Sequence, residues 1–467
     1  MLAISTVAVF TACGSEAEDS TFAEGANGAG GATTSGTFGG PSEDGGATPG
    51  CEGLACQQVD CGGGATTTLT GVVTAPNGTL PLYNVIVYVP NAPLEPIANG
   101  ASCDRCGNVS GKPLVSAITD VEGRFELKNV PVGDDIPLVV QVGKWRRKVT
   151  VPKVDKCVAN PVTSTLTRLP KNKAEGDIPQ IAVTTGRCDQ LACLLPKLGL
   201  DASEFTASSG PGRLHVYRGA AHPTSNPVPA PAPTGSLDAT ALTGSLATLK
   251  KYDMVMLSCE CGEHDETKPP AAKQALYDFA SAGGRIFASH FHYTWADTGP
   301  LATAADWRGS PNNPENPPGP YLIDTTFPKG AALASWLVKV GASSKAGEMP
   351  ISQPRENVGA VVSPTQSWVY RNTADSTMPR STKYLSVNTP VGKPVDDQCG
   401  KFVFADMHLW GGDVQDPATA LPNDGFPATC GTELTPEEKA LAFLFFDLSS
   451  CVQDDTKPPA PPLPPVH

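Results

Sequence analysis

Residues 252–290 read YDMVMLSCECGEHDETKPPAAKQALYDFASAGGRIFASH. The apolar run Tyr252–Cys259 predicts a buried strand, and Pro269–Ala282 predicts a helix with proline at its amino end, where a missing N–H costs little. Gly283-Gly284 ends the helix, and Arg285–His290 is the next apolar run. A strand, a helix and a second strand in this order predict two parallel strands joined by a right-handed crossover.

The same alternation of apolar runs and helical patterns extends over residues 177–451. The further segments are Ile178–Thr185, Cys188–Leu198, Leu214–Tyr217, Leu242–Lys251, Lys401–Met407 and Thr435–Leu448. Thr435 with Glu438 three residues later forms a capping box, which marks a helix start. We therefore expect one α/β domain over 177–451, with a parallel sheet and helices on both of its faces.

Residues 66–168 follow a different pattern, in which short runs rich in Val, Ile and Thr alternate with Gly, Pro, Asn and Asp turns. The runs are TTTLTGVVTAP, NVIVYVP, LVSAITD, RFELKNV, IPLVVQVG, RRKVTVPKV and TSTLTRL. This spacing predicts a small antiparallel sandwich. The chain is thus expected to be multidomain, with an N-terminal all-β sandwich and a C-terminal α/β domain.

The order of the β segments resembles the carboxypeptidase regulatory-like domain. The resemblance is carried by Gly71-Val72-Val73, by Asn84-Val85-Ile86-Val87, by the turn Thr119-Asp120-Val121-Glu122-Gly123-Arg124-Phe125 and by Asn129-Val130-Pro131-Val132-Gly133. It implies a prealbumin-like (Ig-like) sandwich that has no catalytic residues of its own.

Two features of this segment depart from a plain sandwich. The loop from Pro90 to Pro113 contains Cys103 and Cys106, for which we prefer a local disulfide to a zinc half-site, because no second half-site with matching spacing follows nearby. Residues 144–148, KWRRK, are the one basic cluster. A solvated edge strand protected by its charge is the preferred interpretation, and binding of an acidic polymer is the alternative.

The N-terminus resembles a bacterial lipoprotein export signal. The apolar run Leu2–Ala12 is too short to span a bilayer, and Phe10-Thr11-Ala12-Cys13 matches the processing box, so 1–13 is expected to end at a lipidated Cys13. The alternative is an ordinary apolar start beside a chance cysteine. Residues 14–65 are expected to be a disordered Gly-rich tether that ends in a collar of cysteines, and 452–467 a disordered Pro-rich tail.

Composition limits the partners and the compartment. The net charge of −13 argues against nucleic-acid binding, whereas 14 cysteines favour an oxidising compartment. We therefore expect a cell-envelope protein, on the periplasmic or extracellular face, whose membrane partner is reached through the N-terminal lipid. Local disulfides are expected between Cys188 and Cys193 and between Cys399 and Cys430. A lipidated Cys13 would leave an odd number of cysteines, so at least one thiol should stay unpaired.

Candidate chemistry lies where three predicted strands end, because ligands of open parallel sheets bind at the carboxyl ends of the strands. The three segments are Ser258–His264, Ser289–Tyr293 and Asp406–His408. If the strands are neighbours, the ends form a His-rich crevice. On an extended backbone His290 and His292 would point to the same side, so a zinc site is possible with the candidate ligands His290, His292, His408, Asp406 and Glu263. The alternative is that these histidines only bond loop carbonyls and hold the segment from Thr294 to Phe327.

Three segments of this domain resemble the class I glutamine amidotransferase-like superfamily, especially its ThuA-like branch. They are Tyr252-Asp253-Met254-Val255-Met256-Leu257, Gly283-Gly284-Arg285-Ile286-Phe287-Ala288-Ser289-His290, and Gly400-Lys401-Phe402-Val403-Phe404 with His408. The resemblance implies a flavodoxin-like three-layer fold. It does not imply activity, because the elbow offers Ser289 and His290 in place of cysteine, and the terminal segment offers no His-x-Glu. Ser289, His290 and His408 remain the catalytic candidates.

Three functions are compatible with these patterns. We favour an envelope-anchored lipoprotein that binds a ligand, such as a carbohydrate, through a catalytically degenerate amidotransferase-like domain. The alternative is a metal-dependent hydrolase or sugar-modifying enzyme that uses the His-rich strand ends and zinc. A purely structural envelope protein is the third.

Overall fold

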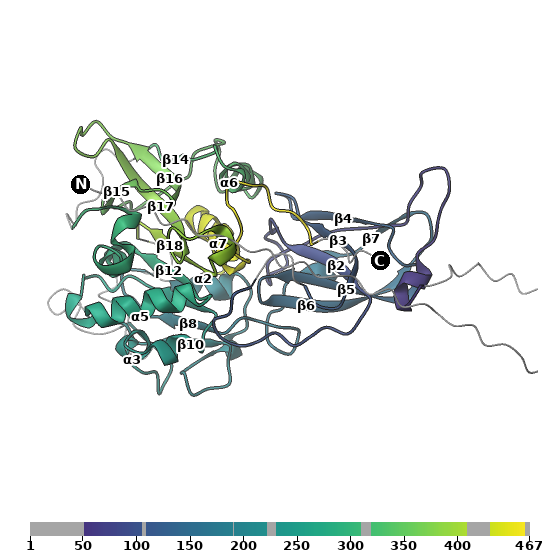
Figure 1. Cartoon of the computed structure of the whole chain (residues 1–467), viewed down its shortest axis with the longest axis horizontal. Helices are drawn as coiled ribbons and strands as arrows, with labels where there is room; N and C mark the ends of the chain where they lie inside the picture. The colour runs from purple at the N-terminus through teal and green to yellow at the C-terminus, as the bar shows by residue number, and fades with distance from the viewer. Residues whose placement is uncertain are drawn as a thin grey trace, which may run out of the picture. The chain divides into compact units, whose positions relative to one another are not determined.

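The computed structural model describes residues 51–104, 109–189, 191–221, 230–309, 319–408 and 430–462. The predicted export signal with Cys13, most of the tether and Cys106 lie outside these residues. Thr48–His467 forms one compact unit that holds two small β-sheets, a large mixed sheet and the helices around it (Figure 1). The predicted multidomain mixture of sheets and helices is confirmed at this level. Among the described residues, no helix has both the length and the apolarity to cross a bilayer.

The first two sheets come from the segment predicted to be all-β. One sheet has the order β4-β1-β7 and the other β3-β2-β5-β6. Their apolar side chains, such as Leu69, Val87, Phe125 and Leu138, are buried in one core. The strands are β1 (Thr68–Val72), β2 (Ile86–Pro90), β3 (Pro113–Ile118), β4 (Arg124–Lys128), β5 (Gly133–Val142), β6 (Trp145–Val154) and β7 (Ala159–Pro161).

The seventh predicted strand, TSTLTRL, is wrong. Ser164–Thr167 forms a short helix, α1, in which the Arg168 N–H donates to the Ser164 carbonyl at 3.0 Å. The Thr167 hydroxyl donates to the Val72 carbonyl at 2.6 Å and fixes this turn against the end of β1. Local hydrogen bonding of threonine side chains to the backbone thus overrides the β propensity of the run.

The turn between β3 and β4 contains Asp120 and Gly123, two of the residues that carry the regulatory-like resemblance, and its geometry shows why they are needed. One carboxylate oxygen of Asp120 accepts the N–H groups of Glu122 at 2.8 Å and Arg124 at 2.9 Å. Gly123 has φ +71°, and a Cβ there would lie 2.5 Å from the Val73 carbonyl oxygen. Aspartate and glycine are therefore required by the turn itself.

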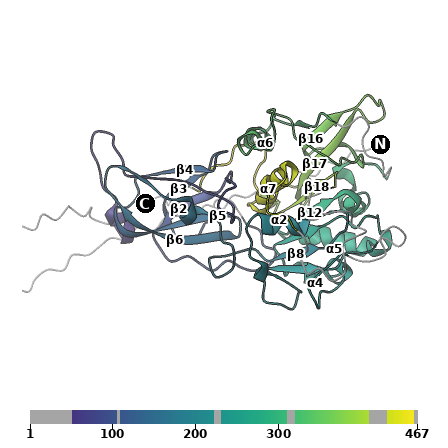
Figure 2. The ribbon, with the colours of Figure 1, turned by 180° about the vertical axis from the view of Figure 1, so that it is seen from behind.

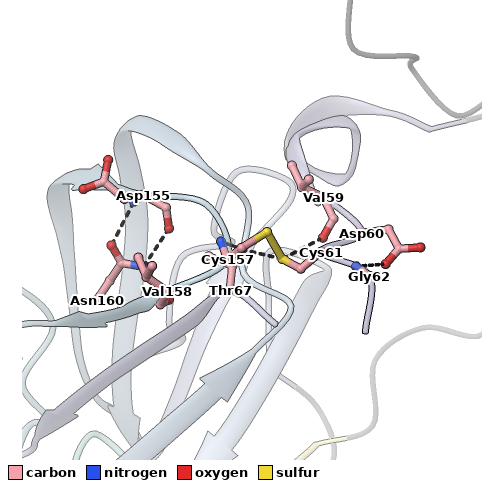
Figure 3. Close-up of a disulfide and its surroundings, with 9 residues drawn as sticks. All are labelled: Val59, Asp60, Cys61, Gly62, Thr67, Asp155, Cys157, Val158 and Asn160. Atoms are coloured by element: carbon pink, nitrogen blue, oxygen red, sulfur yellow. Dashed lines mark hydrogen bonds between the residues drawn. A yellow bond between two sulfur atoms is a disulfide. The ribbon is translucent and has the colours of Figure 1, made fainter. Parts of the chain in front are cut away.

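A disulfide between Cys61 and Cys157 ties the segment before β1 to the turn between β6 and β7 (Figure 3). The Cys157 N–H donates to the Thr67 hydroxyl at 2.9 Å, and the Asn160 side chain closes the same turn onto Asp155. Cys51 and Cys56 form a second, local disulfide. The predicted collar of cysteines is therefore present, but one of its bonds reaches across 96 residues.

The basic cluster on β6 is not a solvated edge. β6 is an edge strand, yet Lys144 and Arg146 are buried. Lys144 Nζ lies 2.6 Å from a carboxylate oxygen of Asp253, and Arg146 Nε lies 2.8 Å from one of Asp177. Lys144 and Arg146 therefore join the sandwich to the α/β segment, which corrects the solvated-edge interpretation for these two residues, whereas Lys148 is exposed.

The large sheet has the order β14-β16-β17-β18-β12-β11-β8-β10-β9. The six strands from β18 to β9 run parallel, and β14, β16 and β17 extend the sheet in antiparallel pairing. Strand bounds are β8 (Ile181–Thr184), β9 (Phe205–Thr206), β10 (Leu214–Tyr217), β11 (Met254–Leu257), β12 (Arg285–Ser289), β14 (Leu322–Ile323), β16 (Gln366–Asn372), β17 (Arg380–Thr389) and β18 (Gly400–Ala405). A separate pair joins β13 (Ala305–Trp307) to β15 (Val358–Val361).

Alternate residues of the parallel strands face two different cores. Met254 and Met256 of β11 lie in one core with helices α2 (Leu191–Lys197), α6 (Pro328–Lys339) and α7 (Pro436–Ser449). Val255 and Leu257 lie in the other with α3 (Ala239–Thr243), α4 (Leu246–Leu249) and α5 (Pro270–Ser281). Figures 1 and 2 show α5 and α7 on opposite sides of the sheet. Helices thus cover both faces, as the alternation predicts.

The C-terminal segment is more ordered than predicted. The capping box is confirmed, with the Thr435 hydroxyl accepting the Glu438 N–H. Beyond α7, the Asp455 side chain is 13% exposed and pairs with Lys329 at 2.8 Å and Lys401 at 3.4 Å. The expected disordered tail therefore includes a residue that these two buried ammonium groups hold in place.

The disulfide pairings contradict the predicted local bonds. Cys103 pairs with Cys399, Cys188 with Cys261, and Cys193 with Cys430. The cysteines are bonded as expected for an oxidising compartment, but each bond joins segments that the fold brings together from distant parts of the sequence. Cys259 is the free cysteine of the described residues, in agreement with the expected unpaired thiol.

Candidate functional site

Three neighbouring strands bring the predicted chemistry to one edge of the sheet. β12 pairs in parallel with β11 on one side and with β18 on the other. The residues that follow them, Ser258-Cys259, His290 and Asp406–His408, therefore leave the sheet at the same edge. The expectation that these strand ends lie side by side agrees with the observed pairing.

Five side chains gather beneath this edge, and we call them the buried cluster. They are Asp189, Cys259, Ser289, His290 and His408, none of which is more than 5% exposed. The Ser289 hydroxyl donates to a carboxylate oxygen of Asp189, and His408 Nδ1 lies 3.5 Å from the other. His290 Nδ1 lies 3.5 Å from Cys259 Sγ, and the rings of His290 and His408 are 4.3 Å apart.

His290 occupies a strained backbone turn. Its φ of +38° follows directly on the extended Ser289, and the chain then enters a 3-10 helix, η4 (His290–Trp295). A non-glycine residue in this region is uncommon and indicates that the surroundings impose the conformation. The sequence, which has no glycine next to Ser289, gave no sign of a sharp turn. The strained position is occupied by an imidazole, and the candidate nucleophile Ser289 lies one residue before it.

Burial changes the ionisation of two members of the buried cluster, His290 and Cys259. Burial and the neighbouring His408 lower the pKa of His290 far below its usual value, while burial and Asp189 raise the pKa of the Cys259 thiol well above its usual value. The thiol is therefore protonated and the imidazole neutral at physiological pH. A cysteine nucleophile needs the thiolate, so the Cys259–His290 contact is not an activated pair in this state.

Ser289 does not have the partner that a serine nucleophile requires. Its hydroxyl bonds Asp189 and the Leu257 carbonyl, and no histidine nitrogen of the described ranges hydrogen-bonds it. His290 and His408, the other catalytic candidates, contact each other and Cys259 and Asp189. The described residues thus bring all three candidates together without forming a nucleophile–base pair.

The predicted His290/His292 clamp does not form. The clamp required an extended backbone, but His290–Trp295 is a 3-10 helix with about three residues per turn, so the two rings leave it in different directions. His292 Nε2 bonds the Ser258 carbonyl at 2.8 Å, and His408 Nδ1 lies 3.0 Å from the Cys188 carbonyl. Both contacts agree with the alternative that strand-end histidines bond loop carbonyls.

The two predicted acidic ligands also have other partners. Asp406 is buried and accepts the N–H groups of Asn357 at 2.8 Å and Val358 at 3.1 Å. Glu263 accepts the Tyr293 hydroxyl. Of the five predicted ligands, only His408 belongs to the group of described residues that could hold an ion, which is Cys188, Cys259 and His408. Cys188 is bonded to Cys261, so its sulfur is not a thiolate in this state.

A cavity of about 280 Å³ opens at the same edge of the sheet, on the side of β8 and β10. We call it the rim cavity. It is lined by the ends of β8, β10 and β11, by the start of α3 and by η4, through Thr184, Arg218, Gly219, Ala220, Ala221, Asp238, Ala239, Thr240, Thr243, Leu257, Glu260, Thr267, His292 and Trp295. A pocket at the carboxyl ends of parallel strands is where an open α/β sheet binds ligands.

The charges around the rim cavity balance. Arg218 pairs with Asp238 at 3.0 Å, and the Glu260 carboxylate lies 3.8 Å from Lys268 Nζ. Glu260 also accepts the Ala220 N–H at 2.8 Å. The wall therefore carries hydrogen-bonding groups of both kinds without a net charge among these four side chains.

Two buried polar atoms of the wall lack partners among the described residues. They are His292 Nδ1 and Trp295 Nε1. Because His292 Nε2 donates to a carbonyl, its Nδ1 is the acceptor nitrogen of a neutral ring, and burial lowers the pKa of this imidazole to about 4. Trp295 Nε1 can only donate. The wall thus holds one unused acceptor and one unused donor.

Sequence reasoning missed Asp189, Arg218 and Trp295. Asp189 follows β8 and Arg218 follows β10, so extending the strand-end rule to these two strands would have included both. Trp295 ends the helical turn that was predicted to be extended. No sequence signal indicated that turn.

Comparisons with known proteins do not assign a family. No family model and no curated protein matches the chain. Two matching solved chains belong to type II cohesin–X-dockerin complexes from Acetivibrio cellulolyticus, both at 17% identity, covering 27% and 28% of this chain and 78% and 84% of theirs, with TM-scores of 0.15 and 0.16. A 9R-lipoxygenase from Cyanothece PCC8801 matches at 19% identity over 21% of this chain and 16% of its own, with a TM-score of 0.11. Similarities of this size carry no argument about fold or function.

Proposed function

We propose that this protein is an envelope lipoprotein that binds a small, neutral, hydroxyl-rich ligand, of the carbohydrate class, in the rim cavity. Its α/β domain is flavodoxin-like and related to the ThuA-like amidotransferases, and it does not hydrolyse glutamine. Its regulatory-like sandwich is a non-catalytic support. A lipid on Cys13 attaches the chain to the membrane.

The observation that carries the proposal is the rim cavity, with its polar lining and its paired charges. A sugar hydroxyl both donates and accepts, so it can pair with Arg218, Asp238 and Glu260, which line the cavity. Arg218 and Asp238 neutralise each other, and Glu260 lies near Lys268, which does not line the cavity, so a strongly ionic ligand is disfavoured. Aromatic and polar groups together are typical of small-molecule pockets.

The strand order supports the flavodoxin-like assignment. With the two-residue edge strand β9 left aside, the parallel strands β8, β10, β11, β12 and β18, numbered along the chain, lie in the order 2-1-3-4-5. That order is the flavodoxin-like one, and its switch point lies between the first and third strands, here β8 and β11. Both strands contribute their last residues, Thr184 and Leu257, to the rim cavity.

A metal-dependent hydrolase or sugar-modifying enzyme is the less well supported alternative. It needs His290, His292 and His408 with free nitrogens directed at one ion. Of these three histidines only His408 belongs to a group of described residues that could hold an ion, and Asp406 already accepts two backbone N–H groups.

Calorimetric titration of the purified protein with neutral mono- and disaccharides tests the proposal, with glucuronate and glucosamine as charged comparisons. We expect a neutral sugar to bind and a Glu260→Gln variant to lose roughly ten- to a hundredfold in affinity, the effect of weakening a hydrogen bond to a charged group. Glu204→Gln is the matched control, since Glu204 is also buried and accepts the N–H groups of Lys173 and Arg213, away from the rim cavity.

Absence of binding by every neutral sugar would overturn the assignment of ligand class. Equal losses in the Glu260→Gln and Glu204→Gln variants would overturn the assignment of the site. Preferential binding of glucuronate or glucosamine would contradict the argument from balanced charge.

A further inference from the structure

We infer that the segments that follow β8, β11, β12 and β18 contain a latent zinc site that the Cys188–Cys261 disulfide keeps closed. The ligands are Cys188, Cys259, His408 and His290. Reduction of this one disulfide opens the site, which takes a thiophilic divalent cation of the zinc class. The inference does not depend on the ligand of the rim cavity.

The ligand atoms already lie together. One ligand atom from each of Cys188, Cys259 and His408 lies within 4.8 Å of the other two. His290 Nδ1 lies 3.5 Å from Cys259 Sγ but outside this group of three, so the ring must shift to become the fourth ligand. Zinc–sulfur and zinc–nitrogen bonds of about 2.3 and 2.0 Å place tetrahedral ligands roughly 3.3–3.8 Å apart, so an adjustment of about 1 Å brings the first three ligand atoms to zinc-binding distances. Two thiolates and two imidazoles are a usual structural zinc set.

Complete burial of a thiol beside an imidazole distinguishes this cluster from an ordinary buried cysteine. Cys259 is the free cysteine of the described residues, and both it and His290 are 0% exposed. The His290 nitrogen that faces the Cys259 sulfur is Nδ1, so this is the nitrogen available to a metal bound between them. The other nitrogen, Nε2, has no hydrogen-bond partner within the described ranges and would carry the proton of the ring.

Asp189 supplies the surroundings that a metal-bound imidazole requires. One of its carboxylate oxygens lies 3.5 Å from His408 Nδ1, and the other accepts the Cys259 N–H at 3.4 Å. The Cys188 carbonyl lies 3.0 Å from the same Nδ1. Two acceptors therefore place the proton on Nδ1 and leave Nε2 free to bind metal. A carboxylate behind a ligating histidine orients the ring and raises its basicity.

The Cys188–Cys261 disulfide keeps the site closed to zinc because a disulfide sulfur carries no charge and binds zinc poorly. A dithiol reductant donates two electrons and two protons, so its two thiols become a disulfide while Cys188 and Cys261 become thiols. Zinc then displaces one proton each from Cys188 and Cys259 and binds both thiolates. Cys261 leaves the site as a free thiol.

A Cys261→Ala variant tests the inference, because it frees Cys188 without reducing the other disulfides. Purified without oxygen and dialysed against zinc, it should hold one zinc per chain by elemental analysis. The unreduced wild-type protein should hold none. Cobalt(II) in place of zinc should give a thiolate charge-transfer band that is lost in Cys261→Ala/Cys259→Ser.

Cys430→Ala is the matched control. It frees Cys193, a buried cysteine of another disulfide that is not in the Cys188, Cys259 and His408 group. Retention of the band without Cys259, or equal zinc in Cys430→Ala, would overturn the inference. So would a Cys261→Ala protein that folds by circular dichroism and holds no zinc, whether or not Cys188 has bonded to Cys259. If Cys261→Ala does not fold, wild-type protein reduced at this disulfide alone, as mapped by peptide mass, must bind one zinc.

Discussion

Ionisable side chains are paired differently at the two ends of β11, β12 and β18. At the amino ends Asp253 pairs with Lys144 at 2.6 Å, and Arg285 donates to the Cys399 carbonyl at 2.6 Å. At the carboxyl ends burial lowers the pKa of His290 and of His292, and His290 Nε2 and Ser258 Oγ have no partners in the part of the chain that is described. Paired groups stabilise a fold, whereas unpaired buried groups cost free energy and tend to mark sites.

The amino end of β18 shows the pairing in its most complete form. Lys401 lies 3.2 Å from Asp447 and 3.4 Å from Asp455. Lys329 on α6 lies 2.7 Å from Asp447 and 2.8 Å from Asp455. Two ammonium groups and two carboxylates thus close a buried ring with no net charge, which joins β18, α6, α7 and the segment after α7.

The largest expected effect is the loss of one member of this ring. Lys329→Met should lower the free energy of unfolding by about 3–5 kcal/mol, because it leaves two buried carboxylates sharing one cation. Urea unfolding with the disulfides intact measures the change. Lys339→Met on the same helix is the control: this side chain is 54% exposed and pairs with Glu122 at 2.8 Å, so its loss should cost less than about 1 kcal/mol. Equal losses in both variants would contradict the contrast between the ends.

The second prediction is that the two ends of the strands lose stability in different pH ranges. Burial lowers the pKa of His292 to about 4, below the usual value of 6.5. As pH falls from about 6.5 to 4, His292 binds a proton in the unfolded chain but not in the folded one. This residue should therefore lower the free energy of unfolding by about 3 kcal/mol over that range. Urea midpoints at several pH values measure it. His292→Gln, which can still donate to the Ser258 carbonyl, should remove this part of the slope.

The amino end should lose stability only at lower pH. Burial opposes ionisation of Asp455, but Lys401 and Lys329 outweigh it and hold the pKa of this carboxyl below its usual value. Its contribution is present above about pH 4 and is lost as pH falls through the folded-state pKa. A slope between pH 6.5 and 4 that is unchanged in His292→Gln would show that His292 is not its source.

The sequence predicted the parallel part of the fold because its strands are uniformly apolar and its helices have clear ends. It did not indicate β17, although nearly all of this strand is buried. The segment RSTKYLSVNT carries serine, threonine and lysine in buried positions, and Lys383 Nζ bonds the Ser381 hydroxyl. Polar residues that are satisfied inside the protein conceal a strand from a pattern based on hydrophobicity.

The candidate site was predictable only where it depends on strand order. The rule that ligands bind at strand ends identified Cys259, Ser289, His290 and His408. The left-handed backbone at His290 and the Cys188–Cys261 bond depend on contacts between distant segments. These two features decide which nitrogens and sulfurs are free, so the predicted ligand set shares only His408 with the group that the fold brings together.

The smallest expected effect compares two buried serines at the carboxyl ends. Ser258 Oγ has no partner among the described residues, so Ser258→Ala should change the free energy of unfolding by less than about 1 kcal/mol, toward greater stability. Ser289 donates to Asp189, so Ser289→Ala should cost about 1–3 kcal/mol, because it removes a donor from a buried carboxylate. Urea unfolding of both variants at pH 7 measures the difference. A cost for Ser258→Ala equal to that for Ser289→Ala would mean that the Ser258 hydroxyl is satisfied in solution, and the contrast between the two ends would then be smaller than these contacts indicate.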